Sequence, residues 1–266
     1  MLPDFIIIGA MKCGTGSLYR YLSTHPDIIP SSIKETNFFL RENNNNIKTS
    51  YRHYFKGNGK YAFEASPNYS KRHLHPGVPE RIHALLPNIK LIYLVRDPIE
   101  RIRSHYVHNF CHGRESNTFS EAIRKSNNYM LTSRYFFQLQ AFLEFYRKDS
   151  ILVVQSEQLR HETEHTLDSI FQFLRISSDY DHTIISNRFH KSSNKRRSTG
   201  FEQYLRGKTQ NKYLIGVLRK STRIFGKTVD RPPISSEDEG LLKEQLQTDT
   251  EKLRELTGQI FNGWQL

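Results

Sequence analysis

The sequence is poor in cysteine and has no long apolar stretch. Only two cysteines, Cys13 and Cys111, occur in 266 residues, which excludes a disulfide framework and a four-thiolate zinc site and indicates a reducing compartment. The longest apolar run near the N-terminus covers residues 5–8, far fewer than the roughly 18 residues of a membrane span. No secretory cleavage pattern surrounds it. We therefore expect a cytoplasmic protein without a membrane span.

The chain also lacks a linker and an excess of acidic residues. No stretch rich in Pro, Gly or Ser divides it, and its 36% hydrophobic content suffices for one core, so a single domain over residues 1–266 is expected. Asp and Glu total 27 against 39 Lys and Arg, a formal charge of +12. This balance predicts an anionic ligand, which by charge alone is a phosphate-bearing cofactor, an acidic glycan, a nucleic acid or an anionic lipid.

Short apolar strands alternate with helical patterns along the chain. Strands are expected at residues 5–9, 61–65, 90–95 and 151–154, with helices around 80–86, 99–112, 133–146 and 164–174. Strands that are apolar on both faces predict an α/β fold, a single domain whose central parallel sheet is flanked by helices. Ligands of such sheets bind at the carboxyl ends of the strands. Ser236 and Glu239 predict a capping box at the start of a final helix.

A glycine-rich turn follows the first expected strand, where residues 9–17 read Gly-Ala-Met-Lys-Cys-Gly-Thr-Gly-Ser. Backbone N–H groups and the helix N-terminus in such a turn attract phosphate, which predicts a P-loop-like phosphate-binding turn. Gly9 and Gly14 have the spacing of the nucleoside-triphosphate loop, but Thr15 stands where that loop requires lysine, and Lys12 lies inside the turn. A dinucleotide fingerprint fits less well, because no third glycine follows Gly16. A plain strand-to-helix connection is the alternative.

A second candidate site follows the strand at residues 90–95. Asp97 is expected to cap the next helix, with Pro98 at its first position. Arg96 lies at the carboxyl end of the strand, and Ser104 lies about two helical turns beyond the cap. A guanidinium and a hydroxyl in these positions are suited to a second phosphate, whereas an arginine paired with a nearby carboxylate is the alternative.

Taken together, these motifs resemble those of the sulfotransferases that use 3′-phosphoadenosine 5′-phosphosulfate, particularly the branch of heparan-sulfate and related bacterial enzymes. Residues 5–39 resemble the 5′-phosphosulfate loop and its surroundings, and residues 91–106 resemble the 3′-phosphate motif. Residues 151–159 and a C-terminal helix ending near Trp264 are also similar. The resemblance covers most of the chain, and its two phosphate motifs are specific in combination.

The resemblance implies roles for individual residues. The cofactor-binding residues that it implies are Lys12, Gly14, Thr15, Gly16 and Ser17 at the 5′-phosphosulfate, Arg96 and Ser104 at the 3′-phosphate, and Lys195, Arg196 and Arg197 in a basic loop over the nucleotide. Lys12 is also implied as catalytic, in contact with the transferring sulfonate and the bridging oxygen. A lysine there stabilises the negative charge that develops on the leaving phosphate.

The acceptor must lose a proton, so a general base is expected near the donor. The resemblance implies a glutamate at the end of a strand, which matches Glu64 in the expected strand 61–65; an ion pair or a helix cap is the alternative for this carboxylate. Lys34 is expected to contact substrate or to close the site. The spacing of His105, His108, Cys111 and His112 suits zinc on a helix, yet we expect no metal, because sulfonate transfer requires none.

We therefore expect an enzyme that moves a sulfonate by in-line transfer from 3′-phosphoadenosine 5′-phosphosulfate to a hydroxyl, rather than an amine. The acceptor is expected to be a glycan, a lipid, a secondary metabolite or a carrier-bound intermediate. One alternative is a nucleotide or small-molecule kinase. Such an enzyme needs carboxylates that bind Mg²⁺, and the sequence offers only Asp97 near a strand end. The other is a basic nucleic-acid-binding protein without catalysis, for which the sequence carries no recognition signature.

Overall fold

The central element of the computed structural model is a parallel sheet. The structure describes residues 1–41, 47–178 and 229–266. Within these ranges five strands lie in the order β2-β3-β1-β4-β5, and all neighbouring strands are parallel. Their bounds are Phe5–Gly9 (β1), Ile28–Pro30 (β2), Tyr61–Ala65 (β3), Lys90–Val95 (β4) and Ile151–Gln155 (β5). The predicted α/β fold with a central parallel sheet is confirmed.

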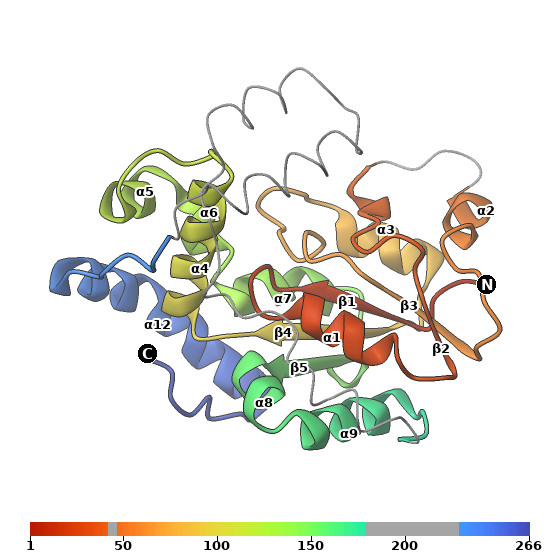
Figure 1. The fold of residues 1–266 in the computed structure, drawn as a ribbon. Coiled ribbons are helices and arrows are strands. Elements are labelled where there is room, and N and C mark those ends of the chain that lie inside the picture. The colour runs from red at the N-terminus through yellow and green to blue at the C-terminus, as the bar shows by residue number, and fades with distance from the viewer. Residues whose placement is uncertain (42–46, 179–228) are drawn as a thin grey trace.

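Helices cover both faces of the sheet (Figure 1). The helix α1 lies on one face with α8 and α9, and α3 lies on the other with α7. The helices of the described residues are α1 (Thr15–Leu22), α2 (Ile47–Arg52), α3 (Val78–Leu85), α4 (Pro98–Cys111), α5 (Phe119–Lys125), α6 (Asn127–Leu131), α7 (Tyr135–Leu143), α8 (Ser156–His161), α9 (Thr163–Leu174) and α12 (Ser236–Thr257), with the 3-10 turns η1 (Phe38–Leu40) and η2 (Lys148–Ser150). This arrangement leaves the carboxyl ends of β1, β3 and β4 side by side at one edge.

The central strands are mostly apolar, which explains why their positions can be predicted from the sequence. All five residues of β1 are buried, and so are the last five of β4. A smaller apolar cluster joins α4, α5, α6 and α12. The strand β2 was not predicted, because three residues are too few to show a period.

Two helix boundaries correct the expectations. The final helix α12 is capped by Ser235, whose Oγ accepts from the Asp238 amide at 3.1 Å, rather than by Ser236. It ends at Thr257, before the left-handed Gly258 (φ 72°), and not near Trp264. The adjacent serines offer the same chemistry, so the sequence could not distinguish them.

A membrane-spanning helix was not expected. Throughout the described ranges, every helix is too short or too polar to cross a bilayer.

Candidate active site

The glycine-rich turn links β1 to α1. Any side chain at Gly9 would overlap Ser70 and approach the Tyr93 ring to 2.7 Å, so glycine is required where the turn begins. Lys12 and Gly14 both have left-handed backbones, with φ of 72° and 96°. Gly14 is the residue before α1, and no side chain caps this helix. The turn therefore places a strained lysine in front of an open helix N-terminus.

The first turn of α1 contains three of the predicted phosphate contacts, Thr15, Gly16 and Ser17. Amides at this end of a helix generally lack an acceptor within the helix and suit an anion, and of the three the Ser17 amide also donates to the Gly14 carbonyl at 2.9 Å. Lys34 lies beside them, since its Cε is 3.8 Å from the position that a Cβ of Gly16 would occupy. The structure thus brings the predicted substrate contact Lys34 to the glycine-rich turn.

Arg96 lies at the end of β4 and is only 7% exposed. Its Nη2 donates to Glu100 Oε2 at 3.0 Å, so Arg96 is paired with a nearby carboxylate in this structure, as the alternative reading expected. Glu100 also accepts from Arg103 Nη1 at 2.6 Å and from Arg231. Three guanidinium groups therefore share one carboxylate, which leaves an excess of positive charge beside the buried Ser104.

The pKa of Glu100 reflects this surplus. Burial opposes ionisation, but the hydrogen bond from Arg103 and the charges of Arg231 and Arg96 hold the pKa below its ordinary value. Glu100 is thus ionised, and the cluster can accept a further anion. Sequence reasoning missed Arg103, although it lies only three residues after Glu100 on the same helix, and it missed Arg231, which follows Glu100 by 131 residues.

Asp97 caps α4 as predicted. Its Oδ1 accepts from the Glu100 amide at 2.9 Å, and its Oδ2 accepts from the Gln265 amide at 2.8 Å. Both carboxylate oxygens are therefore engaged in holding the helix and the C-terminal tail. The carboxylate that a kinase would use for Mg²⁺ has a structural role here.

Glu64 lies on β3, which pairs with β1. The residue is 0% exposed, and each carboxylate oxygen accepts from two hydroxyl groups. The donors are Tyr51 (2.5 Å) and Tyr69 (2.8 Å) to Oε1, with Thr36 and Ser66 (2.9 Å) to Oε2. Burial raises the pKa of Glu64, while the four hydroxyl groups oppose that shift.

A second carboxylate, Glu35, lies at the same strand end and was not singled out from the sequence. Its amide donates to the Ala65 carbonyl at 3.0 Å, which places it directly beyond β3. Its side chain is 44% exposed and pairs with Lys34 Nζ at 2.5 Å. Its backbone is left-handed (φ 62°), a strain that is common at functional sites. The sequence feature that could have pointed to Glu35 is its position next to Lys34, a predicted site residue.

The remaining residues singled out from the sequence are those of the basic loop and those considered for zinc. Lys195, Arg196 and Arg197 lie outside the described residues. In the ranges that the structure describes, no three His, Cys, Asp or Glu side chains are grouped to hold a metal ion. His105 contacts Arg101 Nη1 at 3.4 Å, and its pKa is strongly lowered by burial and by that guanidinium.

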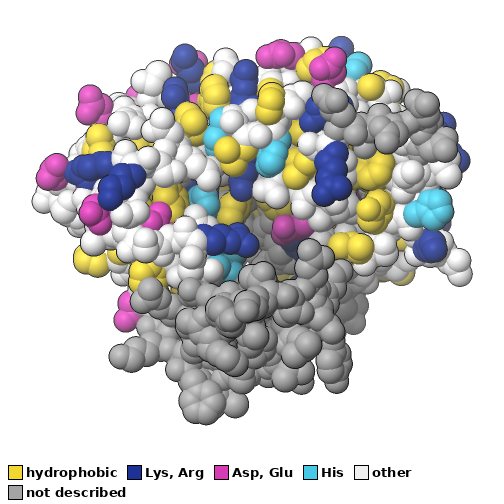
Figure 2. Space-filling model, turned by 90° about the horizontal axis from the view of Figure 1, so that it is seen from above, with side chains coloured by type: hydrophobic (Ala, Val, Ile, Leu, Met, Phe, Trp, Pro, Cys, Tyr) yellow, Lys and Arg dark blue, Asp and Glu magenta, His cyan; other side chains and the backbone are white. Residues whose placement is uncertain are grey.

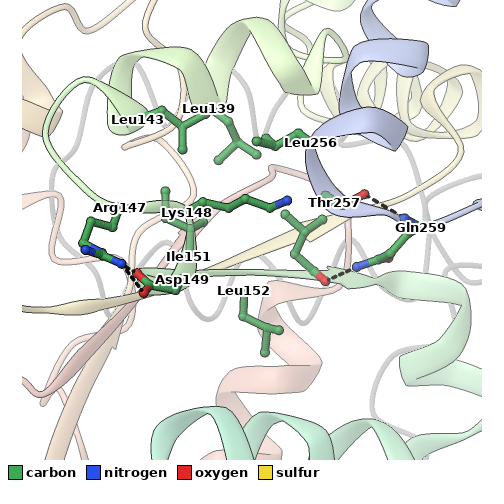
Figure 3. A pocket seen from close by; sticks show the side chains of 11 residues that line it. Leu139, Leu143, Arg147, Lys148, Asp149, Ile151, Leu152, Leu256, Thr257 and Gln259 are labelled. Atoms are coloured by element: carbon green, nitrogen blue, oxygen red, sulfur yellow. Dashed lines mark hydrogen bonds and ion pairs between the residues drawn. The ribbon is translucent and has the colours of Figure 1, made fainter.

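A separate cavity of about 550 Å³ lies between α7, β5 and the end of α12 (Figure 3). Its lining includes Leu139, Leu143, Ile151, Leu152 and Leu256. The charged side chains at its rim include an Arg147–Asp149 ion pair at 3.1 Å. None of the predicted site residues lines this cavity, so the candidate active site does not coincide with it.

Comparisons with known proteins agree with this geometry. The family described as "Sulfotransferase domain" matches residues 2–222. The human bifunctional heparan sulfate N-deacetylase/N-sulfotransferase 2 is 30% identical over 205 residues, covering 68% of this chain and 23% of that protein. The corresponding Drosophila melanogaster protein is 27% identical over 216 residues, covering 68% and 20%. The chain therefore spans less than a quarter of the length of these curated relatives.

Solved structures support the fold. A sulfotransferase from Alicyclobacillus acidocaldarius superposes with a TM-score of 0.71 at 22% identity, covering 100% of both chains. Mouse sulfotransferase SULT7A1, solved in complex with PAP, gives a TM-score of 0.55 at 16% identity, covering 96% of this chain and 88% of that one. Since the family match extends over most of its length, this chain belongs to the sulfotransferase domain family.

Proposed function

We propose that this protein transfers a sulfonate from 3′-phosphoadenosine 5′-phosphosulfate to an acceptor nucleophile. The observation that carries the proposal is the pair of anion sites on neighbouring strands. One is the turn after β1 with the N-terminus of α1, and the other is the arginine cluster after β4. A donor with phosphate groups at both its 5′ and 3′ positions matches two separate sites, and family membership supports the same donor.

In the proposed reaction Lys12 stabilises the leaving group. The acceptor atom forms a bond to sulfur while the bond between sulfur and the bridging oxygen breaks, and negative charge moves onto the 5′-phosphate. Lys12 and the α1 amides would offset that charge more strongly in the transition state than in the bound donor. Arg96 and Ser104 would hold the 3′-phosphate, and the Arg96–Glu100 ion pair would rearrange to admit it.

We propose Glu64 as the general base, acting through Thr36. Tyr51, Ser66 and Tyr69 are buried, whereas Thr36 is partly exposed, so it is the hydroxyl that an acceptor could approach. Thr36 would take the acceptor proton while passing its own to Glu64. Glu35 is the rival base, because its exposed carboxylate needs no intermediary.

The acceptor is proposed to present a hydroxyl group on a glycan, lipid, secondary metabolite or carrier-bound intermediate. The names of the curated relatives refer to N-sulfonation of heparan sulfate. We therefore propose a glycan that bears an amino group as the second acceptor class. Kinase chemistry is less well supported, because Asp97 is held by two amides. Nucleic-acid binding has no feature of the described residues in its favour.

The test is an acceptor screen with the purified protein, the donor and excess chelator. Representatives of each acceptor class, both hydroxyl-bearing and amine-bearing, are incubated and analysed by mass spectrometry. A gain of one sulfonate on one class, with release of 3′,5′-bisphosphoadenosine, supports the proposal. Donor binding without transfer to any class would contradict the catalytic part, and a phosphoryl gain from ATP and Mg²⁺ would favour the kinase.

A further inference from the structure

Lys71 is a buried lysine beside the glycine-rich turn. It follows β3 in a turn that is hydrogen-bonded to the end of β1, through the Ser66 amide to Ile7 O at 3.0 Å and the Ser70 amide to Ile8 O at 3.1 Å. Lys71 is 7% exposed. Its backbone position is therefore fixed next to the start of the turn that contains Lys12.

The ammonium of Lys71 has a poor partner. Its Nζ contacts Met11 Sδ at 3.0 Å, and no carboxylate of the described residues forms an ion pair with it. A thioether is a weak acceptor, so it compensates little for removing a charged group from water. A buried cation in this state is best explained by an anionic ligand that completes its coordination.

The surroundings of Lys71 are mostly cationic. The charged groups whose electrostatic effect reaches Lys71 are Arg101 on α4 and Arg114 after α4, which oppose its protonation, and Glu35 before η1, which favours it. The histidines that its charge affects are His73, His75 and His105. Burial, followed by the charge of Arg101, lowers the pKa of Lys71 to about 8. On the face seen from above (Figure 2), Lys, Arg and His side chains lie near the centre of the described part, together with apolar side chains and an acidic one.

We propose that Lys71 binds the sulfonate oxygens of the donor, together with Lys12. This inference rests on the proposed function. Met11 and Lys12 are adjacent in the glycine-rich turn, so a cation in contact with Met11 lies against the same turn in which Lys12 is proposed to meet the sulfonate. Lys71 would orient the sulfonate for in-line attack and would make no contact with either phosphate group.

The experiment compares two nucleotides that differ by the sulfonate. Affinities of the wild type, Lys71→Met and Lys71→Arg are measured by calorimetry for the donor and for its product, 3′,5′-bisphosphoadenosine, without acceptor. Lys71→Met removes the charge and nearly keeps the shape, and Lys71→Arg keeps the charge. Lys148→Met, at an exposed lysine on the rim of the separate cavity, is the matched control.

In Lys71→Met we expect donor affinity to fall by about 10- to 100-fold, as for a lost charge-assisted hydrogen bond, while product affinity changes by less than about twofold. Lys71→Arg should recover part of the loss, and Lys148→Met should bind both nucleotides like the wild type. Equal losses for both nucleotides, or no loss for either with only the melting temperature changed, would overturn the inference. Failure of the wild type to bind either nucleotide would instead overturn the proposed function.

The pH dependence gives a second readout. Lys71 must be protonated to bind the sulfonate, so donor affinity of the wild type should fall as the pH rises through the lysine pKa of about 8. The fall should be absent in Lys71→Met and displaced to higher pH in Lys71→Arg. A pH profile that is identical in the wild type and Lys71→Met would contradict the assignment.

Discussion

The charged groups at the ends of β4 and β3 differ in how far the protein itself neutralises or solvates them. After β4, three guanidinium groups surround the single carboxylate of Glu100, so the cluster has unused positive charge. On β3, Glu64 is enclosed by four hydroxyl groups and has no open lone pair facing solvent. We propose that a ligand completes the first region, whereas the protein itself already satisfies the second. Substitutions in the first should therefore change binding, and those in the second should change stability and chemistry together.

The largest effect is expected at Glu64. Glu64→Gln keeps the shape and removes basicity, so kcat should fall by about 10²–10⁴-fold while nucleotide affinity stays near the wild-type value. Since the base must be ionised, wild-type kcat should fall as the pH drops through the raised pKa of Glu64, and this acid limb should vanish in the variant. Single-turnover rates over a pH series provide the measurement.

Two companion variants separate chemistry from folding. Glu64→Ala removes the acceptor of four hydroxyl donors, three of them buried, and should lower the free energy of unfolding by about 3 kcal/mol or more. Glu35→Gln should leave both the melting temperature and the acid limb unchanged if Glu64 is the base. A large loss of kcat in Glu35→Gln, combined with near wild-type turnover in Glu64→Gln, would transfer the role to Glu35.

Lys12→Ala should lower kcat by about 10²–10³-fold, as for the loss of one transition-state donor. Because we propose that the phosphate contacts come mainly from the α1 amides and the arginine cluster, affinity for 3′,5′-bisphosphoadenosine should change much less. Steady-state rates and product binding test the two statements separately. Wild-type turnover in Lys12→Ala would refute the catalytic role.

Arg96→Ala should weaken binding of 3′,5′-bisphosphoadenosine by about 1.5–3 kcal/mol, the size of a charge-assisted contact. Affinity for adenosine 5′-phosphate should stay nearly constant, because that nucleotide lacks the 3′-phosphate. Titration of the same variant with both nucleotides gives the comparison. An equal loss for the two would place Arg96 at the 5′ side or in a purely structural role.

The smallest effect concerns the start of α12, a region without binding residues. Ser235→Ala should lower the free energy of unfolding by about 1 kcal/mol, because the Asp238 amide loses its acceptor. Ser236→Ala, one residue inside the helix, should be nearly neutral and serves as the control. Denaturant unfolding of both variants distinguishes them, and the reverse order of effects would contradict the observed cap.

Strands and helix caps that depend only on residues close in sequence could be predicted. The apolar runs of β1, β3 and β4 and the Asp97 cap depend on residues within one strand or one helical turn. Glu64 was identified as a carboxylate within an expected strand, and the structure places it on β3, next to β1.

Contacts between distant segments were not predictable. The four hydroxyl donors of Glu64 include Thr36 and Tyr51, which precede it by 28 and 13 residues. Arg231 contacts Glu100 across 131 residues, and the burial of Lys71 against Met11 depends on the packing of its turn along β1. A sequence indicates which groups can carry charge, but tertiary packing decides which of them are already neutralised.

The most direct test of the central claim compares 3′,5′-bisphosphoadenosine with adenosine 5′-phosphate on the wild-type protein in excess chelator. Two anion sites predict that the bisphosphate binds at least about 10-fold more tightly, the size of one charge-assisted contact, and that chelator has no effect. Equal affinity for the two nucleotides, or binding that requires Mg²⁺, would contradict the account.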